Sequence, residues 1–370
     1  MHSVPFYEYP RAFLDDREEV LDVIDRVSSK GSFIMQAELR EFEEKLASYC
    51  GSKYAIGVAN ATDGLELAWM AHELSEGDEV IVSSHTMLAT ASAIKIAGGV
   101  PVPVGIGSDG LIDPDQIESA ITDKTVGVSP THLNGRTCDM EKIMAIAAKH
   151  SLIVIEDAAQ ALGSSWDGQG AGTFGAAAAI SFYPAKVLGC LGDGGVILVQ
   201  ELELYKKLLA IRDHGRDQNG DVICWGRNSR LDNVQAAVLD MRLEKYPEVI
   251  ARRRELAELY DALLSSVPMI SLEPSRSLTK RSYDIYQNYE IRAKNRDALK
   301  AYLSDNGVGT LIQWGGVPVH QYKQLGFNQD LPAVDEFFTE CLMLPLNTFI
   351  SFDDVRYFCK KVVEFYEKIS

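Results

Sequence analysis

The stretch SLIVIEDAAQALGSSWDGQGAGTFGAAAAISFYPAKVLGCLGDGGVILVQ (residues 151–200) contains three short apolar runs separated by glycine-rich and polar connections. The runs at 151–157, 177–183 and 194–200 have the length of buried β-strands and are bounded by turn-forming residues. A Glu-Asp pair ends the first run, and a lysine follows the second. Ionisable groups therefore stand where two expected strands end.

The same pattern continues toward the N-terminus. Four more apolar runs occur at residues 54–59, 78–84, 100–106 and 125–130. Helical patterns such as DGLELAWMAHEL and MEKIMAIAAKH lie between most of the runs, and Asp113-Pro114 is a cap and first-turn proline that opens a helix. This alternation predicts an α/β fold with a mainly parallel sheet sandwiched by helices.

After residue 246 the pattern changes. Residues 247–267 predict one long charged helix, and it is followed by a strand-like run at 286–293, a helix at 295–307, a strand-like run at 308–314 and a final helix at 353–370. We therefore expect a large domain over residues 1–246 and a small α+β domain over residues 247–370, with the N-terminal segment packing on the small domain.

Composition narrows the functional classes. The chain has 370 residues with 36 Lys and Arg against 53 Asp and Glu, a net charge of −17, which disfavours general binding to nucleic acid or an anionic membrane. Its six cysteines show no metal-ligand spacing and are expected to be reduced, so no metal site is expected. The first twenty residues of the sequence do not show a basic region followed by an apolar stretch, and the sequence contains no run of about 18 apolar residues, so we expect a cytoplasmic protein.

Ligands of parallel sheets bind at the carboxyl ends of the strands, where four polar motifs are expected. Residues 60–64 (NATDG) are expected to start a helix, and they form either an anion-binding cradle or a plain N-cap. Glu156 and Asp157 are either functional acids or capping carboxylates. Lys186 is either a reactive amine or a solvated surface lysine, and residues 227–232 are either an anion site or a cap.

Together these motifs resemble one family. The stretches that carry the likeness are VANATDGLELA (58–68), IEDAAQALGSSWDGQGAGTFG (155–175), AAISFYPAKVLGCLGDGGVIL (178–198) and NSRLDNVQAAVL (228–239). They are similar to the nucleotide-sugar aminotransferases of the DegT/StrS type, which are fold type I enzymes dependent on pyridoxal 5′-phosphate (PLP, with its amino form PMP). The resemblance runs from about residue 5 to the end of the chain and is strongest from 155 to 243.

The resemblance implies roles for particular residues. Lys186 would form the Schiff base with the cofactor, and Asp157, 29 residues earlier, would keep the cofactor's ring nitrogen protonated. Gln160 would lie near the phenolic oxygen. The phosphate would be held by the backbone of Ala61 and Thr62, by Ser181, and by Asn228 of the partner subunit, which implies a homodimer with shared active sites.

Other positions depart from the family pattern. Met87 stands where an aromatic residue commonly stacks on the cofactor, although a thioether also packs against a ring. Asn134 replaces a frequent aromatic residue, and the sequence from Gln313 to Gly315 replaces a common His-Tyr-Pro, with His320 one position late. Tyr183, Asn134, Gln313 and His320 are the expected substrate-binding residues.

The predicted reaction transfers an amino group from glutamate to a nucleotide-linked keto sugar. Thr62-Asp63 and Tyr183 resemble the branch of the family that aminates C3 rather than C4. A sugar dehydratase of the same fold is disfavoured because its members carry histidine at the position of Lys186. A nicotinamide-dependent oxidoreductase lacks support because no GxGxxG follows the first strand. A non-catalytic regulator is disfavoured because both Lys186 and Asp157 are present.

Overall fold

A seven-stranded sheet forms the centre of the molecule. The computed structural model describes residues 3–272 and 281–369. Along the sheet the strand order is β1-β9-β8-β5-β4-β2-β3. The strands are β1 (Tyr54–Val58), β2 (Glu79–Ser83), β3 (Val100–Val104), β4 (Thr125–Ser129), β5 (Ile153–Asp157), β8 (Ala177–Ser181) and β9 (Gly195–Val199). Only β9 runs antiparallel to its neighbours, so the mainly parallel sheet predicted from the seven apolar runs is confirmed.

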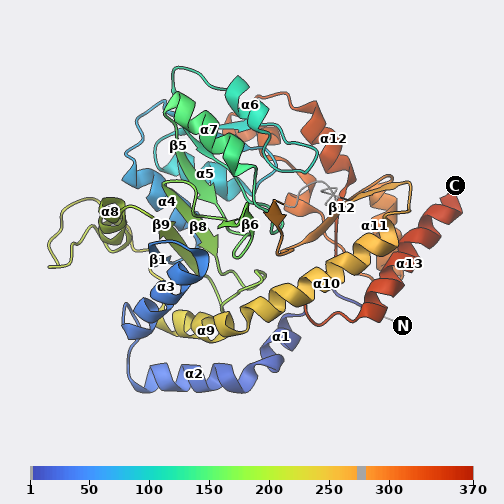
Figure 1. The fold of residues 1–370 in the computed structure, drawn as a ribbon, viewed down its shortest axis with the longest axis horizontal. Coiled ribbons are helices and arrows are strands. Elements are labelled where there is room, and N and C mark those ends of the chain that lie inside the picture. Colours follow the sequence, from blue (N-terminus) through green and yellow to red (C-terminus); the bar gives the residue numbers. More distant parts are fainter. Residues whose placement is uncertain (1–2, 273–280, 370) are drawn as a thin grey trace.

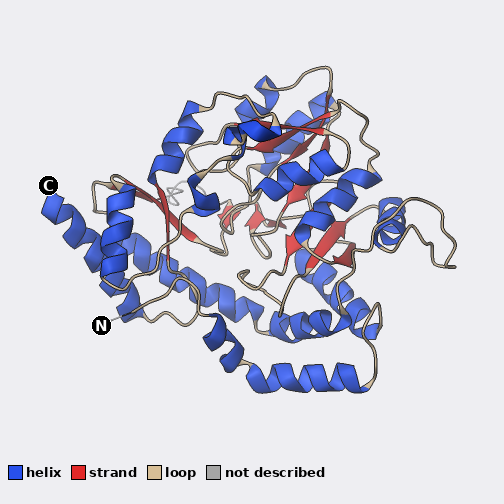
Figure 2. Cartoon of the chain, turned by 180° about the vertical axis from the view of Figure 1, so that it is seen from behind, coloured by secondary structure: helices blue, strands red, loops and turns tan. Residues whose placement is uncertain are grey.

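Helices cover both faces of this sheet, as Figure 2 shows. Alternate residues of β9 point to opposite layers. Val196 and Leu198 pack toward α3 (Ala37–Cys50) and α9 (Asn233–Glu244), while Ile197 and Val199 pack toward α4 (Ala61–Ala71) and α8 (Leu202–Arg212). A strand buried on both faces must be apolar throughout, which is why these strands read as continuous apolar runs. The helices of this part are α1 (Tyr9–Asp15), α2 (Arg17–Ser29), α3 (Ala37–Cys50), α4 (Ala61–Ala71), α5 (Leu88–Ile96), α6 (Pro114–Ser119), α7 (Met140–His150), α8 (Leu202–Arg212) and α9 (Asn233–Glu244).

A second hydrophobic core lies in the C-terminal part of the chain. It is enclosed by α10 (Tyr246–Leu264), α11 (Arg296–Asp305) and α13 (Phe352–Ile369), packed on the antiparallel sheet β10-β12-β13. These strands are β10 (Ile270–Leu272), β12 (Tyr289–Ala293) and β13 (Cys341–Leu344), and α12 (Pro332–Glu340) precedes the last. The long helix α10, in yellow and orange in Figure 1, runs from the large sheet to this second core.

The prediction of a strand at residues 308–314 is wrong. Val308 and Leu311 make only isolated bridges, to Val4 and Met343, and the chain then turns through η1 (Gln313–Gly316). Trp314 and Gly315 have φ of 52° and 65°, and this left-handed backbone ends any extended strand. Smaller elements are the sheet of β6 (Ser165–Trp166), β7 (Gln169–Gly170) and β11 (Ser282–Tyr283), and the short helices η2 (Val319–Gln321) and η3 (Lys323–Leu325).

The N-terminal segment is attached to the C-terminal core. Val4 is buried in that core, donates its N–H to Gly307 O at 2.8 Å and accepts from Gly309 N at 2.9 Å. A Cβ on Gly309 would lie 2.7 Å from the backbone N of Phe6, so a residue without a side chain is needed at 309 for this approach. Residues 5–9 are thereby carried toward the sheet.

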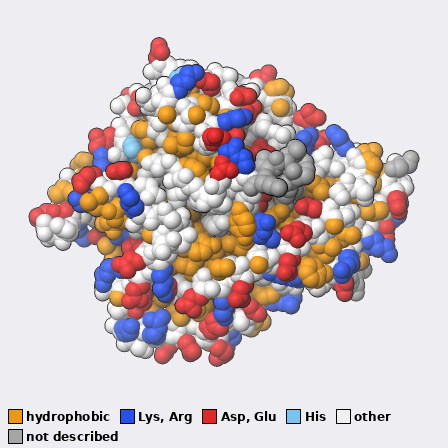
Figure 3. All heavy atoms as spheres, viewed as in Figure 1, with side chains coloured by type: hydrophobic (Ala, Val, Ile, Leu, Met, Phe, Trp, Pro, Cys, Tyr) orange, Lys and Arg blue, Asp and Glu red, His pale blue; other side chains and the backbone are white. Residues whose placement is uncertain are grey.

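None of the helices in the described part of the chain combines the length and the apolar character needed to cross a membrane. On the face drawn in Figure 3, acidic and basic side chains are interspersed among polar ones and an orange hydrophobic band crosses the middle of the molecule.

The packing of α4 gives a prediction about stability. Leu67 is 1 % exposed in the core beneath α4, whereas Leu325 is 60 % exposed in η3. Leu67→Ala should lower the free energy of unfolding by about 2–5 kcal/mol because it leaves a cavity. Leu325→Ala, the same change at an exposed site, should stay within about 0.5 kcal/mol of the original chain. Denaturant unfolding measures both, and equal effects would contradict the assigned packing of α4.

Candidate active site

The carboxyl ends of five strands open into one cavity of about 730 Å³. Residues after β1, β2, β4, β5 and β8 line it, as expected for a parallel sheet. Nine of the residues singled out from the sequence are among those that line this cavity: Ala61, Thr62, Met87, Asp157, Gln160, Ser181, Tyr183, Lys186 and Gln313.

Lys186 lies in the turn that follows β8. Its backbone N–H donates to Tyr183 O at 2.8 Å, so the turn is closed around the lysine. Burial lowers the pKa of the Lys186 amine from 10.5 to about 8, and the negative charge of Asp157 partly opposes that shift. The uncharged share of this amine near neutral pH is therefore much larger than that of an ordinary lysine, and the uncharged form can act as a nucleophile or a base.

Asp157 is held at the end of β5 by donors that keep it in place. It is 5 % exposed, and its Oδ2 accepts from the Thr90 hydroxyl at 2.6 Å while its Oδ1 accepts from Ala159 N at 3.1 Å. A chain of hydroxyl groups continues from Thr90 through Thr86 to Thr131. Threonines carry no sequence signal of this kind, and Thr90 was not anticipated from the sequence.

Glu156, the neighbour of Asp157, has a different place. Successive strand residues point to opposite faces, and Glu156 is fully buried on the side away from the cavity. It accepts hydrogen bonds from the backbone N–H groups of Gly172, Phe174 and Gly175 and from His132 Nε2, at 2.7–2.8 Å. Because Cys138 N donates to Nδ1 of His132, the imidazole proton is on Nε2. Glu156 thus organises a loop, while Asp157 faces the cavity.

The N-terminus of α4 faces the same cavity. Asn60 is its N-cap, and its side chain and carbonyl accept from Asp63 N at 2.8 Å and from Gly64 N at 3.1 Å. The N–H groups of Ala61 and Thr62 precede the first intrahelical bond and are available to an anion. A Cβ on Gly195 of β9 would lie 2.5 Å from the carbonyl carbon of Asn60, so glycine there lets the helix end approach the sheet.

Three residues expected at the site do not line the cavity. Asn134 is buried with φ of 59°; its N–H donates to Gln160 Oε1 at 2.9 Å, and its Oδ1 accepts from Asn288 and Gln313. His320 is buried between Ser84 and Asp335, with its Nδ1 2.7 Å from Ser84 Oγ and its Nε2 3.0 Å from Asp335 Oδ1. Asn228 is exposed on the connection between α8 and α9.

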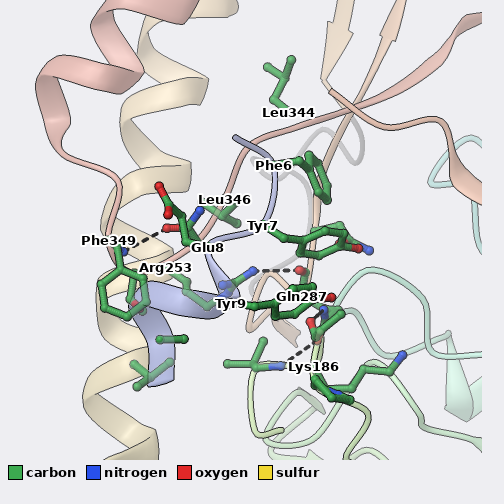
Figure 4. Close-up of a pocket in the computed structure, with 18 residues that line it drawn as sticks. Phe6, Tyr7, Glu8, Tyr9, Lys186, Arg253, Gln287, Leu344, Leu346 and Phe349 are labelled. Atoms are coloured by element: carbon green, nitrogen blue, oxygen red, sulfur yellow. Dashed lines mark hydrogen bonds between the residues drawn. The ribbon is translucent and has the colours of Figure 1, made fainter. Parts of the chain in front are cut away.

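Sequence reasoning missed other residues of the cavity wall. Tyr7 reaches it from the N-terminal segment, and Gln287, Asn288 and Met343 reach it from the C-terminal part. Figure 4 shows Tyr7 and Gln287 on neighbouring segments beside the turn of Lys186. No strand-end rule could find them, because these residues lie far in sequence from the strands whose ends they approach.

The residues present fit pyridoxal phosphate. A lysine amine of lowered pKa, a buried carboxylate and a helix N-terminus with free N–H groups lie around one cavity. These are an amine for the cofactor's aldehyde, a negative partner for its ring nitrogen and a cradle for its phosphate.

Comparison with known proteins agrees with this fit. The DegT/DnrJ/EryC1/StrS aminotransferase family matches residues 14–363. The chain belongs to this family. Family members depend on PLP, and the chain is an aminotransferase.

Two curated relatives cover nearly the whole chain. A pleiotropic regulatory protein of Geobacillus stearothermophilus is 36% identical over 98% of this chain and 99% of its own length. The dTDP-3-amino-3,4,6-trideoxy-alpha-D-glucose transaminase of Streptomyces venezuelae is 36% identical over 93% of this chain and 91% of its own.

Solved structures confirm the fold type I architecture. The crystal structure of DesV from S. venezuelae is similar with a TM-score of 0.95 and 35% identity, covering 99% of both chains. NtdA from Bacillus subtilis, solved with bound PMP, has a TM-score of 0.92 and 29% identity, covering 99% of this chain and 86% of its own.

The lowered pKa of Lys186 gives a testable pH dependence. Labelling of Lys186 in the cofactor-free protein by an amine-reactive reagent should rise through a midpoint near pH 8, since only the uncharged amine reacts. Asp157→Asn removes the charge that raises this pKa, so the midpoint should move to lower pH. Peptide mass spectrometry measures the profile, with Asp63→Asn, another acid of the cavity wall, as the control. A midpoint near the ordinary lysine value of 10.5 would refute the assignment.

Proposed function

We propose that the protein transfers an amino group from glutamate to the keto carbon of a nucleotide-linked sugar, with a 3-keto sugar preferred over a 4-keto sugar. The observation that carries the proposal is the convergence of Lys186, Asp157 and the N-terminus of α4 on one cavity. A cavity of about 730 Å³ is within the range of pockets that enclose a cofactor or ligand of moderate size. The S. venezuelae relative, a transaminase named for a 3-amino sugar, supports the choice of substrate class.

The chain's own residues divide the work. When bound, the cofactor would supply a reactive aldehyde carbon and an electron-withdrawing ring that stabilises negative charge on the adjacent carbon. Lys186 would bind it covalently and afterwards carry a proton to or from that carbon. Asp157, fixed by Thr90, would keep the ring nitrogen protonated. Ala61, Thr62 and Ser181 would hold the phosphate. Met87, 53 % exposed at the N-cap of α5, would cover a face of the ring.

Hydrogen bonding fixes how Gln160 would meet the cofactor. The Oε1 of Gln160 accepts from a backbone N–H, that of Asn134, which can only donate. The Nε2 of Gln160 is therefore the atom left to reach into the cavity as a donor. A donor at this place suits the phenolic oxygen of the cofactor.

The substrate wall carries two polar side chains that can select the orientation of the sugar. Asp63 in the first turn of α4 and Tyr183, 51 % exposed beside the lysine turn, both line the cavity. They present a charged acceptor and a hydroxyl to the sugar. Polar contacts of this kind discriminate strongly between two orientations of a sugar, since the wrong orientation leaves a polar group unpaired. Gln313 would complete the wall, and Asn134 would act through it by accepting its Nε2 hydrogen bond.

The site is proposed to be shared between two subunits. Asn228 lies on the connection between α8 and α9, which projects from the body beside α8 in Figure 1. Trp225 on the same connection is 94 % exposed, and Val222 and Ile223 are also exposed. A second copy that covered these apolar side chains would bring Asn228 to the partner's phosphate. We place the enzyme in the cytoplasm, where its six free cysteines would stay reduced.

The proposed substrate class and the position of amination can be tested directly. Holoenzyme with glutamate should aminate a 3-keto nucleotide sugar faster than the matched 4-keto compound, and NMR of the product locates the new amine. Lys186→Ala should lower turnover by on the order of 1000-fold or more, since the covalent link and the proton carrier are lost together. Amination only at C4 would overturn the regiochemistry, and no amination of any keto sugar would overturn the substrate class.

Subunit sharing is testable by complementation. When Lys186→Ala and Asn228→Ala proteins are mixed, each heterodimer should contain one site with both lesions and one with neither, so activity should exceed that of either parent. The control pair is Lys186→Ala with Asp157→Ala, whose two lesions lie on one chain's cavity and cannot complement. If subunit exchange occurs without recovery in the first pair, Asn228 does not act across the interface.

A further inference from the structure

One side-chain amide holds both peptide groups that flank Lys186. The Nε2 of Gln287 donates to Ala185 O at 2.9 Å, and its Oε1 accepts from Val187 N at 3.0 Å. The first of these belongs to the peptide before Lys186 and the second to the peptide after it. Because one partner can only accept and the other can only donate, the orientation of the amide is fixed. Figure 4 shows Gln287 beside the lysine turn.

Gln287 is itself held from two sides. Arg253 of α10 donates from Nε to Tyr286 O and from a terminal nitrogen to Gln287 O, both at 2.7 Å. Arg253 is 7 % exposed, and burial lowers the pKa of its guanidinium to about 10. On the other side, Gly135 O accepts from Ile285 N at 2.9 Å, and a Cβ on Gly135 would lie 2.5 Å from Gln287 N. The segment 285–287 is thus wedged between α10 and the loop that follows β4.

We propose that Gln287 is the positioning residue of Lys186: by clamping the peptide groups on both sides of the lysine, it fixes the direction in which the amine enters the cavity. The proposal rests on the proposed attachment of the cofactor to Lys186. Gln287 acts through the backbone and belongs to the C-terminal part, so the lysine is aligned only when that part is packed against the large sheet.

The clamp has a physical consequence for the lysine. With both neighbouring peptide planes fixed, the φ and ψ angles of Lys186 are restricted, and the side chain leaves the turn in one direction. A fixed backbone holds the Cα–Cβ bond of Lys186 in one direction and narrows its choice of rotamers, which favours the position of the amine in the surroundings that lower its pKa. Loss of the clamp leaves a partly buried N–H and a partly buried C=O to find new partners, which loosens the turn.

Two variants separate the two bonds of the clamp. Gln287→Met keeps the length of the side chain and removes both hydrogen bonds. Gln287→Glu keeps an acceptor for Val187 N, loses the donor to Ala185 O and adds a negative charge near the lysine. The matched control is Gln200→Met, which removes an amide that accepts from Lys53 N at 3.1 Å beside the β1–β9 end of the sheet.

The readouts are hydrogen exchange of Val187 N–H, the pH profile of Lys186 labelling in the cofactor-free protein, and the rate of PLP attachment followed by absorbance. We expect Gln287→Met to speed exchange at Val187 and to slow attachment, each by about tenfold or more. Gln287→Glu should leave the exchange near its original rate and move the labelling midpoint to higher pH, because a negative charge favours the protonated amine.

The outcomes separate this proposal from the proposed function. If both Gln287 variants match Gln200→Met in exchange and in the labelling profile, the clamp does not position the lysine and the proposal is overturned. If PLP does not attach to Lys186 in the original chain, the proposed function fails, while the exchange and labelling data still decide whether Gln287 controls the lysine turn.

Discussion

A carboxylate and a lysine that line one cavity at the edge of the sheet are the constraint around which the molecule is built. At the end of a buried strand, the Asp157 carboxyl accepts hydrogen bonds from the Thr90 hydroxyl and the Ala159 N–H, which offset the cost of burying it. The same surroundings favour the uncharged form of Lys186. Neither group could be held this way on a flexible loop. The parallel sheet supplies β5 and β8 side by side, with both carboxyl ends at one edge.

Segments distant in sequence complete the cavity. The N-terminal residues bring Tyr7, the turn after Leu311 brings Gln313 and Trp314, and the segment before β12 brings Gln287 and Asn288. All three are anchored to the second hydrophobic core, through Val4, Leu311 and β12 respectively. The large sheet therefore supplies the groups proposed to bind the cofactor, and the smaller core supplies much of the opposite wall.

The sequence predicts features that depend on neighbouring residues better than features that depend on residues distant along the chain. Strands buried on both faces leave a continuous apolar run, so all seven strands of the large sheet were predictable, and with them the cavity positions of Asp157 and Lys186. The run at 308–314 has the same apolar character, yet the positive φ of Trp314 and Gly315 turns it aside. Asn134 was expected to face a substrate, but its hydrogen bonds to Gln160, Asn288 and Gln313 bury it. Such long-range hydrogen bonds have no local pattern.

The path of the N-terminal segment affects where an affinity tag can be placed and whether the N-terminus can be shortened. Val4 is pinned between Gly307 and Gly309, and three residues later Tyr7 forms part of the cavity wall. An affinity tag fused ahead of residue 1 would therefore be tethered within a few residues of the cavity, and trimming the first seven residues would uncover apolar surface and open one side of the pocket at once. Tags are better placed after α13. A loss of activity in an N-terminally tagged variant should be compared with the untagged chain before the loss is attributed to a substitution.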